Sequence, residues 1–177
     1  MTAQVGLRVA ALCLDGKGRL SERAVCATAV RAGLLVDLAL TGRLVEVDDA
    51  LELDDSPTGD PPTDLLLREI TTSPGTTLDT WLERPRPNLR DLAEEAVRSG
   101  RWTLRRGLHA GLRFTDRWPG QTAADRDRDP SAGSSGMRPA DAAVSALALT
   151  TGLLPGHGGR VGELPDADLL ALSLIHI

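Results

Sequence analysis

The chain has 177 residues, of which 41% are hydrophobic and only 2% aromatic, and it carries a formal net charge of −5. This length fits one domain with a sizeable core, which Leu, Val and Ala must fill because Tyr is absent. The apolar runs are too short to span a bilayer, and no basic, hydrophobic and cleavable leader is visible. We therefore expect a cytoplasmic protein whose contact with membranes is peripheral.

The charge is divided along the chain. Residues 1–83 carry 7 basic and 14 acidic side chains, residues 84–117 carry 9 and 4, and residues 118–177 carry 4 and 7. One basic segment between acidic flanks indicates a localised anion-facing surface rather than a general nucleic-acid coat. The basic residues are 19 Arg and a single Lys, which is typical of a GC-rich bacterial genome.

The N-terminal part of the chain predicts a buried helical core. An apolar segment over 5–14 ends at the turn Asp-Gly-Lys-Gly. Ser21 can start a helix that runs to about Leu40, and Gly42 supplies its C-terminal stop. The end of this helix is apolar on nearly every side, which is typical of a helix inside a larger bundle.

One charged residue, Arg31, interrupts this apolar helix. A guanidinium keeps its charge and is costly to desolvate without a partner. The positions one turn away on the same helix (27, 28, 34 and 35) carry no carboxylate. Arg31 must therefore meet an acid from another segment, such as Asp60 or Asp64, or an anion from outside. The sequence leaves both possibilities open.

The middle of the chain predicts short elements. Apolar and acidic residues alternate over 44–53, which indicates a short β-hairpin. A turn at 56–60 leads into an amphipathic helix over 62–71, and a short helix follows at 77–83. The acidic residues from 48 to 55 lack the spacing and the glycine of a calcium loop, so we interpret them as a solvated face.

A helix and a basic hairpin come next. Pro87 suits the first turn of a helix that ends at Ser99. Over 101–115, apolar residues alternate with arginines on both sides of a Gly-Leu turn, which predicts a projecting β-hairpin. The hairpin either attracts an anionic membrane or packs over the bundle with its arginines in water. Its candidate contact residues are Arg101, Trp102, Arg105, Arg106, Leu108 and Arg113.

The rest of the chain predicts a loop over 119–137, an Ala/Leu helix over 140–154, a second loop over 156–162 and the start of a helix at 166–171. The predicted fold is therefore mainly α. It is a single-domain helical bundle over 1–171 with a short β-hairpin near 44–53 and a projecting basic β-hairpin near 101–115.

The last six residues, 172–177, look foreign to the domain. Leu-Ser-Leu-Ile-His-Ile reads as the translation of a transposon end used as a sequencing adapter. We therefore exclude this tail from functional interpretation and expect the domain to be incomplete at its C-terminus.

Four motifs follow one another in a specific order: Leu-Ala-Leu-Thr-Gly-Arg-Leu at 38–44, Pro-Thr-Gly-Asp at 57–60, Val-Arg-Ser-Gly at 97–100 and Arg-Trp-Pro at 117–119. With the hairpin and the late Ala/Leu helix, they resemble the Golgi phosphoprotein 3 family over residues 7–155. The resemblance implies a mostly helical domain that binds phosphatidylinositol 4-phosphate at a membrane surface. Eukaryotic members sit on the Golgi and help to retain glycosyltransferases, and the family hairpin is implicated in oligomerisation and membrane contact.

The resemblance also implies head-group residues. Arg31 matches the family arginine in the long apolar helix, and Arg86 matches the first of an arginine pair before the hairpin. The second of that pair falls on Leu89, or on Arg90 if one residue is skipped. Glu22 stands where the family has a pocket tryptophan, and segment 120–138 lacks the charged helix that is usual in the family.

Elementary chemistry supports an anion site at Arg86 and Arg90. Pro87 at the first helical position would leave the next backbone N–H groups free, and the helix dipole favours an anion at that end. Arginine can also fork two hydrogen bonds onto a phosphate. We therefore expect Arg31, Arg86 and Arg90 to bind a phosphorylated head group on an anionic phospholipid membrane. Self-association through the hairpin and client membrane proteins are further expected partners.

The main alternative is a winged-helix nucleic-acid-binding protein, because a helix followed by an arginine-rich hairpin imitates a recognition helix and its wing. Against it, the helix carries Asp91, Glu94 and Glu95, which phosphates would repel. An enzyme is disfavoured because G-x-S-x-G, HExxH, CxxC and Walker sequences are all absent. We therefore expect no catalysis, no cofactor, no metal and no nucleic acid.

Overall fold

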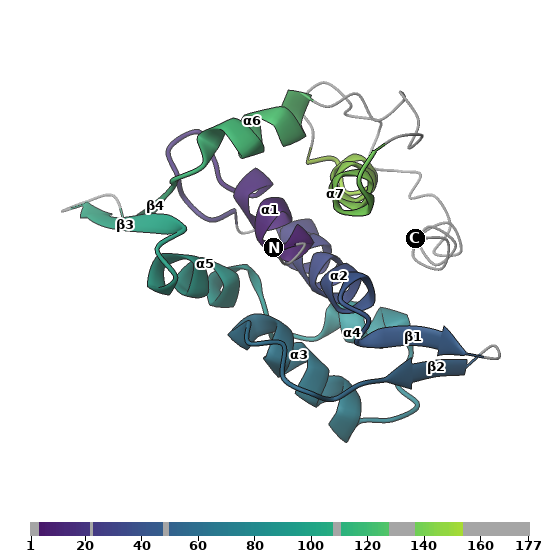
Figure 1. The fold of residues 1–177 in the computed structure, drawn as a ribbon. Helices are drawn as coiled ribbons and strands as arrows, with labels where there is room; N and C mark the ends of the chain where they lie inside the picture. The colour runs from purple at the N-terminus through teal and green to yellow at the C-terminus, as the bar shows by residue number, and fades with distance from the viewer. Residues whose placement is uncertain (1–3, 22, 48–49, 108–110, 128–136, 154–177) are drawn as a thin grey trace.

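The computed structural model describes residues 4–21, 23–47, 50–107, 111–127 and 137–153. Within these residues the chain forms seven helices and two antiparallel two-stranded sheets (Figure 1), which confirms the predicted mainly α fold with two short hairpins. The elements are α1 (Val5–Leu12), α2 (Ala24–Leu40), β1 (Leu44–Val47), β2 (Ala50–Leu53), α3 (Pro61–Thr72), α4 (Leu78–Glu83), α5 (Leu89–Arg98), β3 (Trp102–Gly107), β4 (Gly111–Asp116), α6 (Pro119–Asp127) and α7 (Pro139–Thr150).

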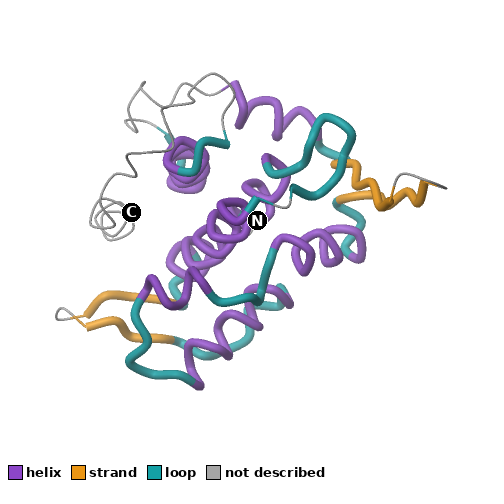
Figure 2. The backbone as a smooth tube through the Cα atoms, turned by 180° about the vertical axis from the view of Figure 1, so that it is seen from behind, coloured by secondary structure: helices purple, strands orange, loops and turns teal. Residues whose placement is uncertain are grey.

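Helix α2 is the centre of the bundle. It packs against α1, α3, α4, α5 and α7, and it is apolar around most of its circumference because nearly every side faces another helix. The two hairpins leave the bundle at opposite ends, β1–β2 at one and β3–β4 at the other, as Figures 1 and 2 both show. No helix in the described ranges combines the length and the apolar character of a membrane span.

Helices α1 and α2 cross at two glycines. A Cβ atom on Gly33 would lie 2.7 Å from the Cα of Gly6, so neither helix could approach the other as closely with a larger residue there. One turn beyond Gly33, the carboxylate of Asp37 accepts hydrogen bonds from the backbone N–H groups of Val5 (2.7 Å) and Gly6 (2.9 Å). A side chain of α2 thus caps the N-terminus of α1.

The predicted limits of the helices hold to within a few residues. Helix α2 begins at Ala24, three residues after Ser21, and ends at Leu40 as predicted, with Gly42 in the left-handed conformation after the cap. There the backbone N–H of Arg43 donates to the carbonyl of Leu38 at 2.8 Å, which closes a Schellman motif. Helix α3 begins at Pro61 with Asp60 as its N-cap.

The predicted loop over 119–137 is wrong in its first half, where α6 forms. Asp125 of α6 is fully buried, and it accepts a hydrogen bond from Nε of Arg8 at 2.9 Å. Arg8 also pairs with Asp141 of α7 at 2.8 Å, so one arginine of α1 holds both helices. Residues 128–136, 156–162 and 166–177 lie outside the described residues, and so do the predictions that fall on them.

Candidate functional site

Arg31 lies in the core with 1% of its surface exposed. Its Nε donates to the carbonyl of Trp81 at 2.5 Å, its Nη1 to the carbonyl of Pro87 at 3.2 Å, and its Nη2 to Oε2 of Glu69 at 3.1 Å. Burial lowers the pKa of Arg31, and the carboxylate of Glu69 opposes that change. An internal acid therefore meets this arginine, and the acid is Glu69 of α3.

The two acids expected beside Arg31 have other partners. Asp60 caps α3 by accepting from the backbone N–H of Thr63 at 3.1 Å. Asp64 accepts from both the backbone N–H and the hydroxyl of Thr58 at 2.6 Å. Both carboxylates thus fix the turn before α3, and the sequence pointed to the wrong acids because it does not show how α3 is rotated against α2.

Arg31 does meet the segment that carries Arg86, because it donates to the carbonyl of the next residue, Pro87. The same guanidinium holds α4 through Trp81, whose indole Nε1 donates to the carbonyl of Thr76 at 3.0 Å. The guanidinium of Arg84 lies over the Trp81 ring, 4.9 Å from its centroid. Arg31 therefore anchors α3, α4 and the segment before α5 on the central helix.

The N-terminus of α5 differs from the prediction. Pro87 lies before the helix, and Asn88 is the N-cap. The side chain of Asn88 accepts from the backbone N–H groups of Arg90 (2.9 Å) and Asp91 (3.3 Å), while Asp91 accepts from the N–H of Asn88 (2.9 Å). This capping box uses the N–H groups that were expected to be free, and Asp91 already supplies a negative charge at this end.

Arg86 and Arg90 remain at the surface, with 64% and 66% of their side chains exposed. Arg86 pairs with Asp91, and the Nε of Arg90 lies 3.8 Å from Glu94. Arg86 lines a groove of about 410 Å³ between α3 and α5, whose lining does not include Arg90. The structure thus brings Arg31 of α2 into contact with the segment that carries Arg86, and it leaves Arg90 on the outer face of α5.

Two further arginines, Arg68 of α3 and Arg98 of α5, line the same groove and were missed by the sequence analysis. Arg98 could have been found, because it follows Asp91 and Glu94 at helical spacing on one face of α5. Arg68 could not, since its position depends on the packing of α3 against α5.

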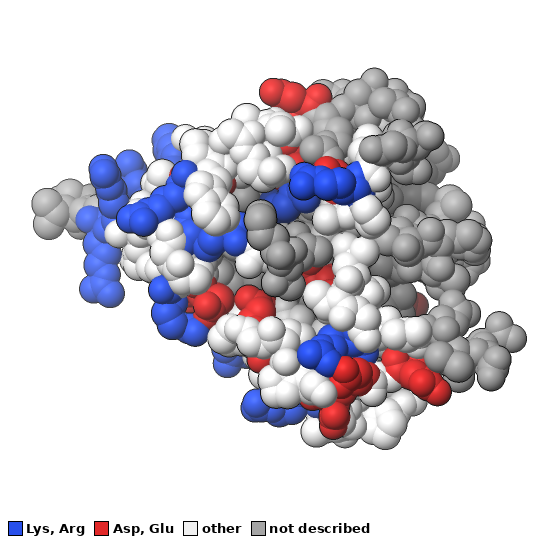
Figure 3. Space-filling model, in the orientation of Figure 1, with Lys and Arg blue, Asp and Glu red and all other residues white. Residues whose placement is uncertain are grey.

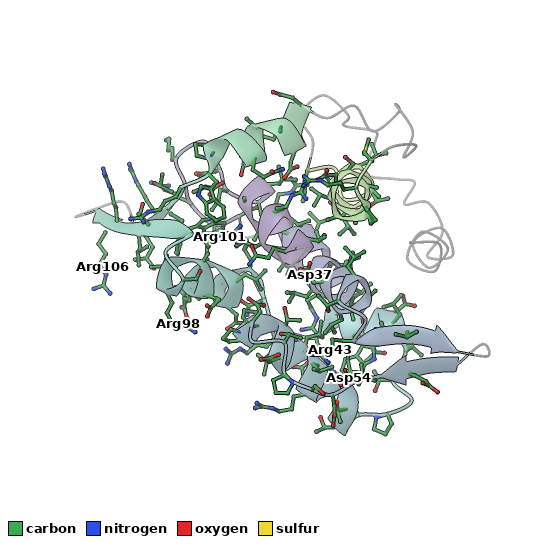
Figure 4. The ribbon with its side chains drawn as sticks, in the orientation of Figure 1. Asp37, Arg43, Asp54, Arg98, Arg101 and Arg106 are labelled. Carbon is green, nitrogen blue, oxygen red and sulfur yellow. The ribbon has the colours of Figure 1, made fainter. Side chains whose placement is uncertain are left out.

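The basic hairpin is rooted in the core. Trp102 and Phe114 are 2% and 3% exposed, and their ring centroids lie 6.0 Å apart. The sequence had placed Trp102 on the exposed contact surface of the hairpin, and this is wrong. Trp102 instead fixes the base of the hairpin in the core. Arg106 extends from the outer part of the hairpin (Figure 4), and Leu108 lies outside the described residues.

Four arginines share one face of this hairpin. Arg105 of β3 stands directly opposite Arg113 of β4. The backbone N–H of Arg117 donates to the carbonyl of Arg101 at 3.0 Å, which continues the ladder by one more pair. Since alternate residues of a strand share a face, the two pairs lie on the same side. We call Arg101, Arg105, Arg113 and Arg117 the basic face.

No carboxylate in the ranges that the structure describes lies within 4 Å of the four guanidinium groups of the basic face, although Asp116 and Asp60 attract Arg101 from farther away. Like charges directly opposite each other destabilise a strand pair. Figure 3 shows blue side chains gathered over this end of the molecule. The hairpin therefore keeps an electrostatic cost that an external anion would relieve.

The family model described as Golgi phosphoprotein 3 (GPP34) matches residues 9–170. The chain belongs to the Golgi phosphoprotein 3 family. This confirms the resemblance drawn from its motifs. Comparison with curated proteins gives no match.

Two family motifs in this Golgi phosphoprotein 3 family member have structural roles. The motif at 38–44 ends α2 and enters β1, and the motif at 57–60 fixes the turn that caps α3. Both motifs therefore stabilise the fold, and neither identifies a ligand. Glu22, at the position of the family's pocket tryptophan, lies outside the described residues. Helix α6 occupies the first part of segment 120–138, where the sequence indicates no charged helix of the kind that is usual in the family.

Proposed function

We propose that this Golgi phosphoprotein 3 family member is a peripheral adaptor that docks reversibly on anionic membranes through its basic face. The observation that carries the proposal is the pair of opposed arginine rungs, Arg101 with Arg117 and Arg105 with Arg113, which form no ion pair within 4 Å with a described carboxylate. An anionic lipid surface supplies the missing counter-charge.

The energetics favour reversible and oriented binding. Each arginine near an anionic leaflet contributes on the order of 1 kcal/mol at most, so the four arginines of the basic face contribute at most about 4 kcal/mol. The whole chain has a net charge of −5 and is repelled by the same leaflet in other orientations. The basic hairpin must therefore face the lipid, and high salt must release the protein.

A phosphorylated head group, phosphatidylinositol 4-phosphate by the family resemblance, would add specificity. Arg86 and Arg90 are exposed and within reach of a ligand, whereas Arg31 is covered by Glu69, whose side chain is 22% exposed. We propose that a head-group phosphate replaces Glu69 at Nη2 of Arg31 while Arg86 and Arg90 donate from the surface. The other two hydrogen bonds of Arg31 stay with the backbone.

Vesicle co-sedimentation tests docking by the basic face. We expect the full chain to bind vesicles that contain phosphatidylglycerol and not vesicles of phosphatidylcholine alone. The double variant Arg105→Ala/Arg113→Ala should bind about tenfold more weakly. Arg68→Ala/Arg126→Ala, which removes the same charge from exposed sites on α3 and α6, is the matched control. Equal binding by the two double variants would contradict the proposal.

Vesicles containing phosphatidylinositol 4-phosphate test the head-group site. Glu69→Gln removes the competing carboxylate, so its affinity for these vesicles should rise, while Arg86→Ala/Arg90→Ala should lower it. Neither variant should change binding to phosphatidylglycerol vesicles by more than about twofold, because a charge outside the basic face contributes little there. If Glu69→Gln binds phosphatidylinositol 4-phosphate no better than the parent, the exchange at Arg31 is wrong.

A gel shift with duplex DNA at physiological salt separates this proposal from the nucleic-acid alternative. Arg86, Arg90 and Arg98 are each paired with an acid of α5, which are Asp91, Glu94 and Glu95 respectively. That surface is close to neutral, and a groove-reading helix needs free basic or amide side chains. We expect no retardation at concentrations that saturate anionic vesicles.

A further inference from the structure

Large apolar side chains are exposed at few places in the described residues. They are Val45 (46%), Leu104 (37%), Trp118 (53%) and Leu149 (40%). Trp118 is the most exposed of them, and it follows directly on Arg117 of the basic face. A single exposed apolar side chain is ordinary in a folded protein. Trp118 differs from the other three by its position at the edge of the basic face, where Arg101 lies over its ring.

The backbone of Trp118 is held firmly at the corner between β4 and α6. Its N–H donates to Oδ1 of Asp116 at 2.9 Å, and its carbonyl accepts from the N–H of Gln121 at 3.0 Å. The second oxygen of Asp116 accepts from the hydroxyl of Thr122 at 2.6 Å, which fixes the carboxylate. A residue held in this way binds without a large cost in backbone entropy.

The side chain of Trp118 is paired with a cation of the basic face. The guanidinium of Arg101 lies over the indole, 4.0 Å from the ring centroid. Burial lowers the pKa of Arg101, so this cation is partly desolvated. Over the described ranges, neither the guanidinium of Arg101 nor the indole N–H of Trp118 has a hydrogen-bond acceptor. The pair thus offers an apolar ring and several free donors at one place.

We propose that Trp118 and Arg101 form an interfacial anchor for an anionic bilayer. The indole enters the region between head groups and acyl chains, where its apolar ring and its polar N–H are both satisfied. Arg101 stays over the ring and donates to a lipid phosphate. This inference rests on the proposed membrane docking and adds to it an apolar contact that electrostatics alone would not provide.

Tryptophan emission tests the anchor directly, because the other two tryptophans are buried: Trp81 is 6% exposed and Trp102 is 2% exposed. When phosphatidylglycerol vesicles are added to the full chain, the emission should shift to shorter wavelength, and brominated acyl chains should quench it. Binding with no shift and no quenching would overturn the anchor while leaving electrostatic docking intact. Failure to bind the vesicles at all would overturn both.

Variants give a second readout. Trp118→Ala should bind phosphatidylglycerol vesicles about tenfold more weakly, because the ring no longer leaves water, and Trp118→Phe should recover part of the loss. Val45→Ala, an exposed apolar residue at the opposite end of the molecule, is the matched control and should bind like the parent. Residual binding by Trp118→Ala should be more sensitive to salt than binding by the parent. Equal affinities for Trp118→Ala and Val45→Ala would contradict the anchor.

Discussion

At the scale of single residues, Arg31 connects three segments to the central helix. One guanidinium joins α2 to α3 through Glu69, to α4 through the carbonyl of Trp81, and to the segment before α5 through the carbonyl of Pro87. Two of these three bonds go to the backbone, which no sequence pattern marks. The sequence could show that Arg31 needs a partner, but the identity of that partner follows from the tertiary packing.

We predict that Arg31→Ala lowers the free energy of unfolding by about 3 kcal/mol, because it leaves a partly buried carboxylate and two carbonyls without their donor. Urea unfolding followed by circular dichroism measures this. Arg90→Ala removes the same charge from a side chain that is 66% exposed and should stay within about 0.5 kcal/mol of the parent. Similar losses in both variants would show that Arg31 is not a structural anchor.

Asp37 gives the molecule a specific dependence on pH. Burial raises its pKa to about 6, although the N–H groups of Gly6 and Val5 oppose the change. In the unfolded chain the same group titrates near pH 4, so the folded state holds the proton more tightly. Protonation of Asp37 therefore stabilises the fold at low pH, and this contribution is lost as the pH rises from about 4 to above 6.

The corresponding prediction compares the parent with Asp37→Asn. Between about pH 4 and pH 7 the parent should lose up to about 3 kcal/mol of stability relative to this variant, as the proton leaves Asp37. Urea unfolding at several pH values measures the difference. Asp79→Asn, which alters an exposed carboxylate on α4, should follow the parent at each pH. A constant difference between the parent and Asp37→Asn would contradict the raised pKa.

At the scale of elements, the crossing of α1 and α2 depends on close backbone approach at Gly6 and Gly33. We predict that Gly33→Ala destabilises the protein by about 2 kcal/mol, although alanine favours a helix by about 1 kcal/mol over glycine. The added Cβ would meet the backbone of α1, so the helices must separate. Thermal unfolding gives the sign of the effect.

Gly16→Ala is the matched control for this crossing, because a Cβ at Gly16 would meet nothing within 4 Å. It should leave the midpoint of thermal unfolding close to that of the parent. If Gly33→Ala raised the midpoint, helix propensity would outweigh packing, and the account of the α1–α2 crossing would be wrong.

The elements that could be predicted from the sequence are those with a local cause. The stop of α2 at Gly42, the alternating hairpin at 44–53 and the arginine-rich hairpin all follow from turn chemistry and periodicity. Helix α6 could not be predicted, because it is polar and begins with Pro-Gly. Its stability comes from Arg8, which is 117 residues away from Asp125 in the sequence.

In the candidate site, too, the features with a local cause could be predicted from the sequence and those that depend on tertiary packing could not. Three arginines of the basic face, Arg101, Arg105 and Arg113, belong to the predicted hairpin set, but Arg117 does not. That set also mixed the two faces, because Trp102 and Arg106 lie on the other side of the strand. The cap at Asn88 was missed because Pro87 also suits the first turn of a helix, and the choice between the two depends on where the chain turns. The stacking of Arg101 on Trp118 joins the two ends of the hairpin segment and needs the strand register to be known.

At the scale of the whole molecule, charge is separated in space as well as along the chain. The basic hairpin and the hairpin at 44–53 leave opposite ends of the bundle, and the N-terminal 83 residues carry twice as many acids as bases. A net negative protein that binds an anionic surface must do so in one orientation. In the proposed docking, the separation of the two hairpins therefore determines which end faces the lipid.

Hydrogen exchange of the full chain, with and without phosphatidylglycerol vesicles, tests this orientation most directly. We predict slower exchange in β3, β4 and the segment around Trp118 when vesicles are present, and unchanged exchange in β1 and β2. Protection that is confined to β1 and β2, or bound protein with no protection in β3 and β4, would contradict docking through the basic face.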